Sequence, residues 1–188
     1  ISGDASFIKL GAGTLTLSGA NSYTGGTTIS AGVIKLGSAG TSSSGPLGTM
    51  AAGTTVASGA ALDLAGYSLA AAEPLTISGT GVSGGGAIFN SSATAVTLAS
   101  PITLAANASI QGGSAALTLS GAITGAYTLD VGGSSSITLG SVNMAALNVT
   151  SSGALSLGAT TLTGALSANS GNGNITQTGA LAIGGTSS

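Results

Sequence analysis

The stretch GTLTLSGANSYTGGTTISAGVIKLG, residues 13–37, contains two short segments in which apolar and polar residues alternate. Leu15 and Leu17 flank a threonine in the first segment, and Ile34 and Leu36 flank a lysine in the second. Alternation with a period of two is typical of a β-strand that has one buried and one solvated face. Gly, Asn, Ser and Thr fill the connection, as they do in turns. The stretch therefore predicts two strands of the same kind, with Leu17 and Leu36 19 residues apart.

The same alternation recurs along the whole chain, and no segment has helical spacing. Four of the charged residues, Lys9, Lys35, Asp63 and Asp130, occupy the middle position of such a segment, where we expect the side chain to point outward. The alternating segments lie at residues 7–10, 15–17, 34–36, 62–64, 75–77, 96–98, 102–104, 117–119, 129–131, 137–139, 147–149, 155–157 and 181–183.

The spacing between comparable strands is nearly constant. The closing residues lie 21, 21, 20 and 18 residues apart in the series Ile77, Leu98, Leu119, Leu139 and Leu157. A period of about 20 residues indicates a repeat architecture, in which each repeat buries its apolar face against the next. The interval from residue 36 to residue 64 is 28. We interpret residues 37–50 as a loop that is inserted into one repeat and projects outward.

Two architectures accommodate short strands with glycine-rich turns. An antiparallel sandwich needs turns about every 8 to 12 residues, whereas a parallel β-helix needs roughly 20 residues per three-sided coil and tolerates small side chains. The sequence has only two Phe and no Trp for a sandwich core. We therefore predict an all-β fold: one right-handed parallel β-helix over residues 1–188, a solenoid of about nine coils.

The composition fits stacked coils and excludes several classes of function. Of 188 residues 34 are Gly and only six are charged, because like charges stacked in a ladder repel one another. With two Lys and no Arg the chain has no basic surface for nucleic acid, which we do not expect as a partner. No apolar run is long enough for a membrane-spanning helix, so we expect no membrane-spanning segment. No signal peptide is recognised at Ile1.

No residue pattern indicates catalysis or metal binding. Asp63 and Asp130 are separated by more than three coils, about 16 Å, which exceeds the distance between paired glycosidase carboxylates. Asp63 and Glu73 could share a coil, but the chain has no His or Cys to assist them. The glycine-rich segment 78–87 lacks the following helix and Lys of a phosphate-binding loop and is expected to form corners. We expect no enzyme activity and no catalytic, cofactor-binding or metal site.

Some polar residues have both a structural and a functional interpretation. Tyr23, Tyr67 and Tyr127 could contact sugars, although Tyr23 is better explained by packing at a corner. Asn90, Asn107, Asn148 and Asn174 match the N-glycosylation tripeptide, which arises often by chance in Ser/Thr-rich sequence. Outward threonines could form an ice-binding array or simply reflect β-propensity; they are Thr16, Thr76, Thr97, Thr103, Thr118 and Thr138.

Residues 9–37, KLGAGTLTLSGANSYTGGTTISAGVIKLG, resemble the passenger-associated strand repeat of bacterial autotransporters, including Asn21, Tyr23, Gly25 and Gly32. Residues 60–92 are similar to sequence that commonly follows this repeat, and residues 116–133 resemble a weaker second copy. The resemblance implies a secreted, surface-exposed β-helical stalk of an autotransporter or a two-partner-secreted adhesin. Such stalks support adhesion or biofilm formation, or carry enzymes at their tips. The family plan also includes a terminal membrane β-barrel, and we do not recognise its many lipid-facing alternating strands within residues 1–188.

The ends of the chain suggest a partner. Neither ISGDASFIKL nor GALAIGGTSS is typical of a polar cap, so we expect copies to associate head to tail through their end coils and to form filaments. The alternative is a module that binds host or matrix glycans, or matrix protein, through the loop at 37–50 or through a lateral face of the coils.

Overall fold

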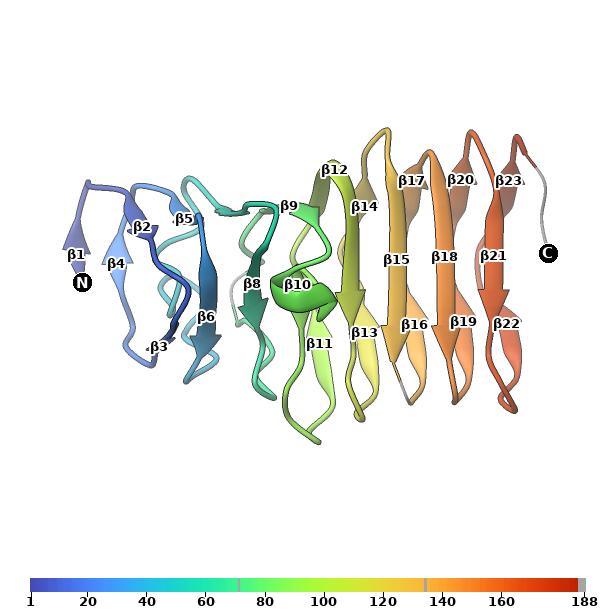
Figure 1. Ribbon diagram of the computed structural model, residues 1–188, viewed down its shortest axis with the longest axis horizontal. Helices are drawn as coiled ribbons and strands as arrows, with labels where there is room; N and C mark the ends of the chain where they lie inside the picture. Colours follow the sequence, from blue (N-terminus) through green and yellow to red (C-terminus); the bar gives the residue numbers. More distant parts are fainter. Residues whose placement is uncertain (71, 134, 186–188) are drawn as a thin grey trace.

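The computed structural model describes residues 1–70, 72–133 and 135–185. The strands pair in parallel from one coil to the next, and the prediction of a parallel β-helix of about nine coils is confirmed. The coils lie side by side in one row, with the two termini at opposite ends (Figure 1). Within the described residues the one helical element is the short 3-10 helix η1 (Val82–Gly84).

The first face of the solenoid consists of two separate sheets. β1 (Ser2–Gly3) pairs with β4 (Ser22–Tyr23) near the N-terminus. In the later coils one in-register sheet forms this face, with threonine or serine in the middle of each of its strands. These strands are β11 (Val96–Leu98), β13 (Leu117–Leu119), β16 (Ile137–Leu139), β19 (Leu155–Leu157) and β22 (Ile175–Gln177).

The second face contains a strand from every coil, stacked from one end of the solenoid to the other. Its strands are short because glycine-rich corners follow them at once. They are β2 (Phe7–Lys9), β5 (Thr27–Ile29), β7 (Thr54–Val56), β9 (Leu75–Gly79), the first part of β12 (Ile102–Gln111), β14 (Ile123–Thr124), β17 (Val142–Met144), β20 (Thr160–Leu162) and β23 (Leu181–Ile183).

The third face is joined to the second through β12, which runs across both and shifts register between Leu104 and Ala108. Apolar and polar residues alternate along its longer strands, so that polar side chains point outward. The strands are β3 (Thr14–Leu17), β6 (Gly32–Leu36), β8 (Ala60–Asp63), β10 (Ile88–Phe89), the second part of β12, β15 (Thr128–Gly133), β18 (Ala146–Ser151) and β21 (Leu166–Asn169).

The interior is filled by columns of aliphatic side chains that stack in register. Val96, Leu117, Ile137 and Leu155 form one such column on the first face, and all four are buried. Burial of apolar surface at about 25 cal/mol per Å² is the main stabilising contribution in such a core. Because each column continues through several coils, one coil supplies the apolar surface that the next coil needs.

Lys9 does not point outward, and this part of the prediction is wrong. It pairs with Ile29 in an inward column, whereas Ile8 and Leu10 are 58% and 71% exposed. The Lys9 ammonium donates hydrogen bonds to the carbonyl oxygens of Leu10, Gly11 and Ala31, at 2.9, 2.7 and 3.1 Å. These three acceptors satisfy the charge at the corner of the first coil, which lets the side chain take an inward position.

The spacing of 21 residues predicted that Ile77 and Leu98 occupy equivalent positions in successive coils, and this part of the prediction is wrong. Ile77 pairs with Leu104 on the second face, whereas Leu98 pairs with Leu119 on the first face. Residues 80–87, including η1, lengthen this coil between β9 and β10, and they stand out beside β10 (Figure 1). The glycine-rich segment therefore contains an insertion rather than a simple corner.

The segment 37–50 leaves the stack intact, because Thr27 still pairs with Thr54. The expectation that it projects outward is wrong for residues 45–48, which are buried. The Asn21 side-chain amide donates to the Pro46 carbonyl at 2.8 Å, and the Thr27 hydroxyl donates to the Leu47 carbonyl at 2.9 Å. The second half of the insertion thus lies over the coil and covers part of its interior.

Candidate functional site

The third face carries a grid of outward polar side chains where β12, β15, β18 and β21 stack. One outward row contains Gln111, Gly132, Thr150 and Asn169, which are register partners in four consecutive coils. Consecutive members of a row are about 4.8 Å apart, the spacing of paired strands. The neighbouring row contains Ser109, Asp130, Asn148 and Ser167, of which Ser109 is buried and the other three are exposed.

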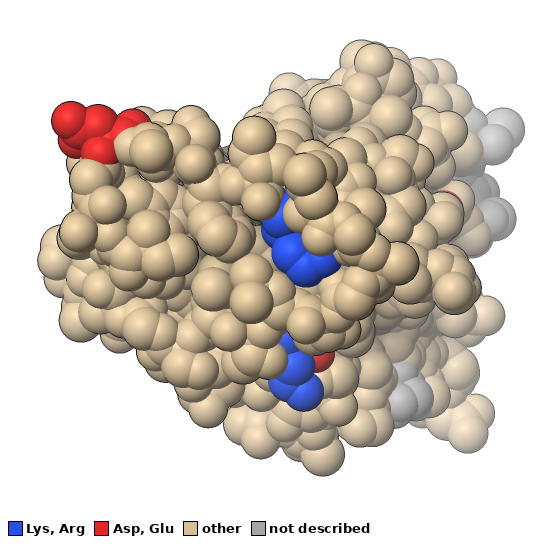
Figure 2. All heavy atoms as spheres, turned by 60° about the vertical axis from the view of Figure 1, so that its left-hand side comes forward, with Lys and Arg blue, Asp and Glu red and all other residues tan. Residues whose placement is uncertain are grey.

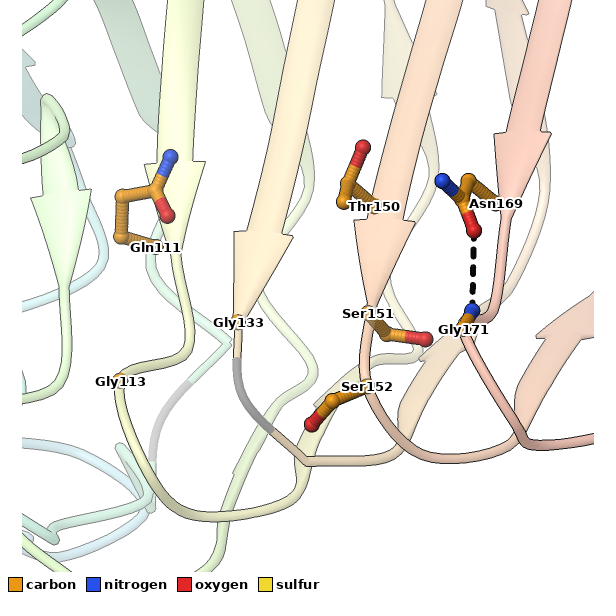
Figure 3. Close-up of a pocket in the computed structure, with 8 residues that line it drawn as sticks. All are labelled: Gln111, Gly113, Gly133, Thr150, Ser151, Ser152, Asn169 and Gly171. Atoms are coloured by element: carbon orange, nitrogen blue, oxygen red, sulfur yellow. Dashed lines mark hydrogen bonds between the residues drawn. The ribbon is translucent and has the colours of Figure 1, made fainter.

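A groove of about 570 Å³ runs along the first of these rows. Figure 3 shows the Gln111, Thr150 and Asn169 side chains on three of four neighbouring strands, with Gly133 at the end of the strand between Gln111 and Thr150. Among the described residues, the lining consists of polar side chains and glycine backbone: Gln111, Gly113, Gly133, Thr150, Ser151, Ser152, Asn169 and Gly171.

Glycines create the hollow. Gly132 occupies the row position between Gln111 and Thr150, and a Cβ atom there would clash with the Gln111 side-chain amide. The amide of Gln111 therefore lies over the gap that Gly132 leaves. At the other end of the row, the Asn169 side-chain oxygen accepts a hydrogen bond of 2.9 Å from the Gly171 N–H, which fixes the orientation of its amide.

None of the described residues that line the groove is charged. Asp130 lies in the neighbouring row, where its carboxylate accepts a hydrogen bond of 2.7 Å from the Asn148 side chain. The two lysines of the chain lie far from the groove, in the first two coils: Lys9 is in β2 and Lys35 is in β6. The view in Figure 2 shows the same scarcity of charge, with isolated blue and red groups on a surface that is otherwise uncharged. The site offers hydroxyl and amide groups in a neutral setting.

The acidic residues considered in the sequence are held by local hydrogen bonds. Asp63 is 3% exposed, and its carboxylate accepts from the backbone N–H groups of Ala65 and Ser91 and from the Ser91 hydroxyl. Lys35 lies 3.9 Å from it. These contacts tie the corner after β8 to the corner after β10. Among the described residues, no three His, Cys, Asp or Glu side chains form a group that could hold a metal ion.

Glu73 belongs to a buried polar cluster with Tyr23, Thr27 and Thr54. The Thr54 hydroxyl donates to the Glu73 carboxylate, and the Tyr23 and Thr27 hydroxyls are hydrogen bonded at 2.6 Å. Burial raises the pKa of Glu73 to about 7, although the Thr54 hydrogen bond lowers it. Burial also raises the pKa of Tyr23, with a smaller raising contribution from the nearby Glu73. The interpretation of Tyr23 as a packed residue is confirmed.

The remaining candidate residues fall on different parts of the solenoid. Thr16 lies on the third face, Thr76 and Thr103 on the second, and the other predicted threonines, 97, 118 and 138, on the first. Asn90 is buried and receives hydrogen bonds from the Gly66 and Ser92 N–H groups, so it forms a structural corner. The candidate tyrosine and asparagine side chains that are exposed are Tyr67, Tyr127, Asn107, Asn148 and Asn174.

Sequence reasoning did not single out the groove residues Gln111, Thr150 and Asn169. They match no motif, and only their register on one face brings them together. The sequence feature that could have indicated the groove is a polar residue directly after an apolar segment, which occurs in three of these four successive coils. That signal is weak because most corners of this chain have a similar composition.

Comparison with known families explains the N-terminal coils. Residues 7–36 match the family model described as the passenger-associated-transport-repeat. These residues are a passenger repeat. The repeat spans β2 to β6, so that it supplies two stacked strands on the second face and two on the third. The resemblance to autotransporter passengers is confirmed for this segment, and it supports a location outside the cell.

The passenger repeat covers part of the chain, and a second family covers the other end. Residues 143–188 match repeats of unknown function, described as DUF5649. The described part of that match corresponds to the coils from β17 onward. No curated protein and no solved structure matches the chain. No helix in the described part of the chain is long and apolar enough to cross a membrane.

Proposed function

We propose that the chain is a structural spacer of a secreted, cell-surface passenger, which holds other parts of an adhesin away from a bacterial surface and supports adhesion or biofilm formation. The observation that carries this proposal is the stack of about nine coils with continuous apolar columns, combined with the passenger repeat at residues 7–36. A stack of this kind resists bending because every coil is hydrogen bonded to its neighbours. Its role requires no enzyme activity.

Shape measurements test the spacer. Negative-stain electron microscopy and small-angle X-ray scattering of the purified chain should show a rod of about 40 to 45 Å, the length of nine coils at about 4.8 Å each. A particle that is compact in all directions would contradict a spacer role. A surface-display strain provides the functional measurement: we expect that removal of residues 1–188 from the displayed protein reduces attachment of cells.

The proposed partner is a second copy of the chain. Among the described residues β22 pairs only with β19, and β23 pairs only with β20, so both strands offer one free edge. Ile175 in β22 is 49% exposed. If the second-face register continued into another copy, β2 would pair with β23 and Lys9 would lie over Ile183. Lys9 would place a charge in this contact and weaken it.

This role of Lys9 gives a sharp test of self-association. Lys9→Met keeps the length of the side chain and removes the charge, so we expect it to promote head-to-tail filaments in sedimentation and electron microscopy. Lys35→Met is the matched control, since it changes the charge equally on the lateral surface. The self-association proposal is excluded if the wild-type chain and Lys9→Met both remain monomers at high concentration.

Glycan or matrix-protein binding is a second candidate function, and the groove on the third face favours it. The loop at 37–50 is less suitable as a recognition loop, because residues 45–48 are buried against the coil. Binding of the whole chain to immobilised neutral glycans, sulfated glycans and collagen tests this candidate. A chain that retains none of these ligands would not have this function.

A further inference from the structure

We propose that the groove along Gln111, Gly132, Thr150 and Asn169 binds a neutral glycan chain that lies parallel to the solenoid axis. The proposal rests on the glycan-binding candidate and specifies its ligand, its site and its direction. It is independent of head-to-tail association, because the groove lies on a lateral face.

The shape of the groove sets the direction of the ligand. The row positions are register partners in consecutive coils, so equivalent groups recur along the axis about every 4.8 Å. This rise is close to the length of one sugar unit in an extended polysaccharide. Segment 80–87, which contains η1, stands beside β10 near one end of the row. Gly86 in this segment lies close to the Gln111 side chain, so the segment lies beside the first residue of the row.

The charge of the site selects the class of ligand. No cation lies on the third face between β12 and β21, and the nearest carboxylate is that of Asp130 in the neighbouring row. A sulfated, phosphorylated or uronic-acid polymer would therefore find no positive partner here. A neutral ligand loses no favourable hydration of a charge when it enters the groove.

The hydrogen-bonding groups select among neutral ligands. Side-chain amides at Gln111 and Asn169 and the hydroxyl at Thr150 both donate and accept, which matches sugar hydroxyls. An extended peptide would instead need unpaired backbone groups, but the backbone of β15 and β18 is paired with both neighbouring coils. A peptide strand therefore has no edge to join on this face. None of the lining residues that the structure describes is aromatic, so we expect each sugar to contribute modestly and affinity to grow with chain length.

The test uses the full 188-residue chain and neutral hexasaccharides of cellulose, xylan and amylose, observed by saturation-transfer NMR and titration calorimetry. We expect at least one of them to bind, and the corresponding disaccharide to bind more weakly. The double variant Gln111→Met, Thr150→Val keeps the side-chain volumes and removes two hydrogen-bonding groups, and we expect it to weaken binding about tenfold. Asn169→Asp keeps the hydrogen bond from Gly171 while adding a charge.

Thr103→Val is the matched control, because Thr103 is an exposed threonine in an in-register row on the second face. We expect its affinity to equal that of the wild-type chain, and circular dichroism checks that all variants are folded. If a hexasaccharide binds and the double variant binds equally well, the groove assignment fails while the glycan-binding candidate stands. If no neutral hexasaccharide binds, or if heparin binds more tightly, the neutral-glycan assignment of the groove fails. The broader glycan- or matrix-binding candidate is then decided by the sulfated glycans and collagen, and the spacer proposal is unaffected.

Discussion

At the scale of single residues, the polar cluster of Tyr23, Thr27, Thr54 and Glu73 is the main departure from an aliphatic interior. Thr27 and Thr54 occupy the column that contains Leu75 and Ile102 in later coils. The insertion at 37–50 makes this possible, since the Leu47 carbonyl accepts the hydrogen bond of Thr27. Glu73 is only 4% exposed, so its ionisation carries a cost in the folded state.

Stability should therefore depend on pH through Glu73. Its pKa is about 7 in the folded chain and near 4.5 when unfolded, so the unfolded chain loses this proton first as pH rises. The contribution of Glu73 to stability is present below pH 4.5, falls between pH 4.5 and about 7, and is lost above. Glu73→Gln should raise the free energy of unfolding at pH 8 by up to about 3 kcal/mol and leave it nearly unchanged at pH 4.

Urea unfolding of both proteins at the two pH values measures this difference. Asp4→Asn is a suitable control, because Asp4 is an exposed carboxylate that accepts a hydrogen bond from Thr24. A Glu73→Gln variant whose advantage is equal at pH 4 and pH 8 would show that ionisation of Glu73 is not the cause.

In the passenger repeat, the backbone conformation and the close packing of neighbouring coils require glycine at one position, Gly32. Gly32 has φ of +67°, and a Cβ atom there would clash with the carbonyl oxygens of Gly11 and Gly13 in the preceding coil. Gly32→Ala should lower the free energy of unfolding by about 1 to 3 kcal/mol. At Gly13, φ lies outside the positive range and a Cβ atom would meet nothing within 4 Å, so Gly13→Ala should have little effect. Thermal unfolding of both variants decides whether close coil packing requires Gly32.

At the scale of elements, the alternating pattern was enough to predict most strands and their inward faces. It failed at residues 7–10, where two apolar residues, Ile8 and Leu10, are exposed and a lysine is buried. Alternation alone cannot distinguish the two phases of a strand when carbonyl groups are available to neutralise a buried ammonium. It also missed the insertion at 80–87, because glycine-rich sequence serves for insertions and for corners alike.

The insertion at 37–50 should contribute to stability in its second half. Leu47 is buried in the main core, whereas Met50 is 43% exposed. Leu47→Ala should lower the free energy of unfolding by about 2 to 4 kcal/mol, because it leaves a cavity over the polar cluster. Met50→Ala removes a similar side chain from the surface and should change it by about 0.5 kcal/mol or less. Equal effects of the two substitutions in urea unfolding would mean that the insertion packs loosely.

At the scale of the whole molecule, the sequence predicted the architecture better than the candidate site. The fold depends on a pattern that is repeated about nine times, so errors in one or two coils do not change it. The groove depends on one register, that of Gln111 with Gly132, Thr150 and Asn169, and on the absence of a side chain at one position. A missed insertion such as residues 80–87 breaks the register between the coils before it and the coils after it, as between Ile77 and Leu98, although Leu98, Leu119 and Leu139 remain partners.

The stacked columns also predict how the molecule opens. On the second and third faces, the strands of the central coils are paired on both sides, as β15 is with β12 and β18. By contrast, β2 and β23 are paired on one side among the described residues. Opening should therefore begin at the ends and cost more free energy toward the centre. In native-state hydrogen exchange at low protein concentration, we expect amides of β13 to β18 to exchange more slowly than those of β2 and β23.

The same measurement connects stability to assembly. If copies stack head to tail, β2 and β23 gain a second neighbour, and their amides should become protected as protein concentration rises while those of β13 to β18 stay unchanged. Lys9→Met should shift this protection to lower concentration, because the end coil no longer places an ammonium in the contact. If all coils exchange equally slowly at low concentration, the solenoid opens as one cooperative unit. Contacts with another copy at the ends would then not protect the amides of the terminal coils selectively.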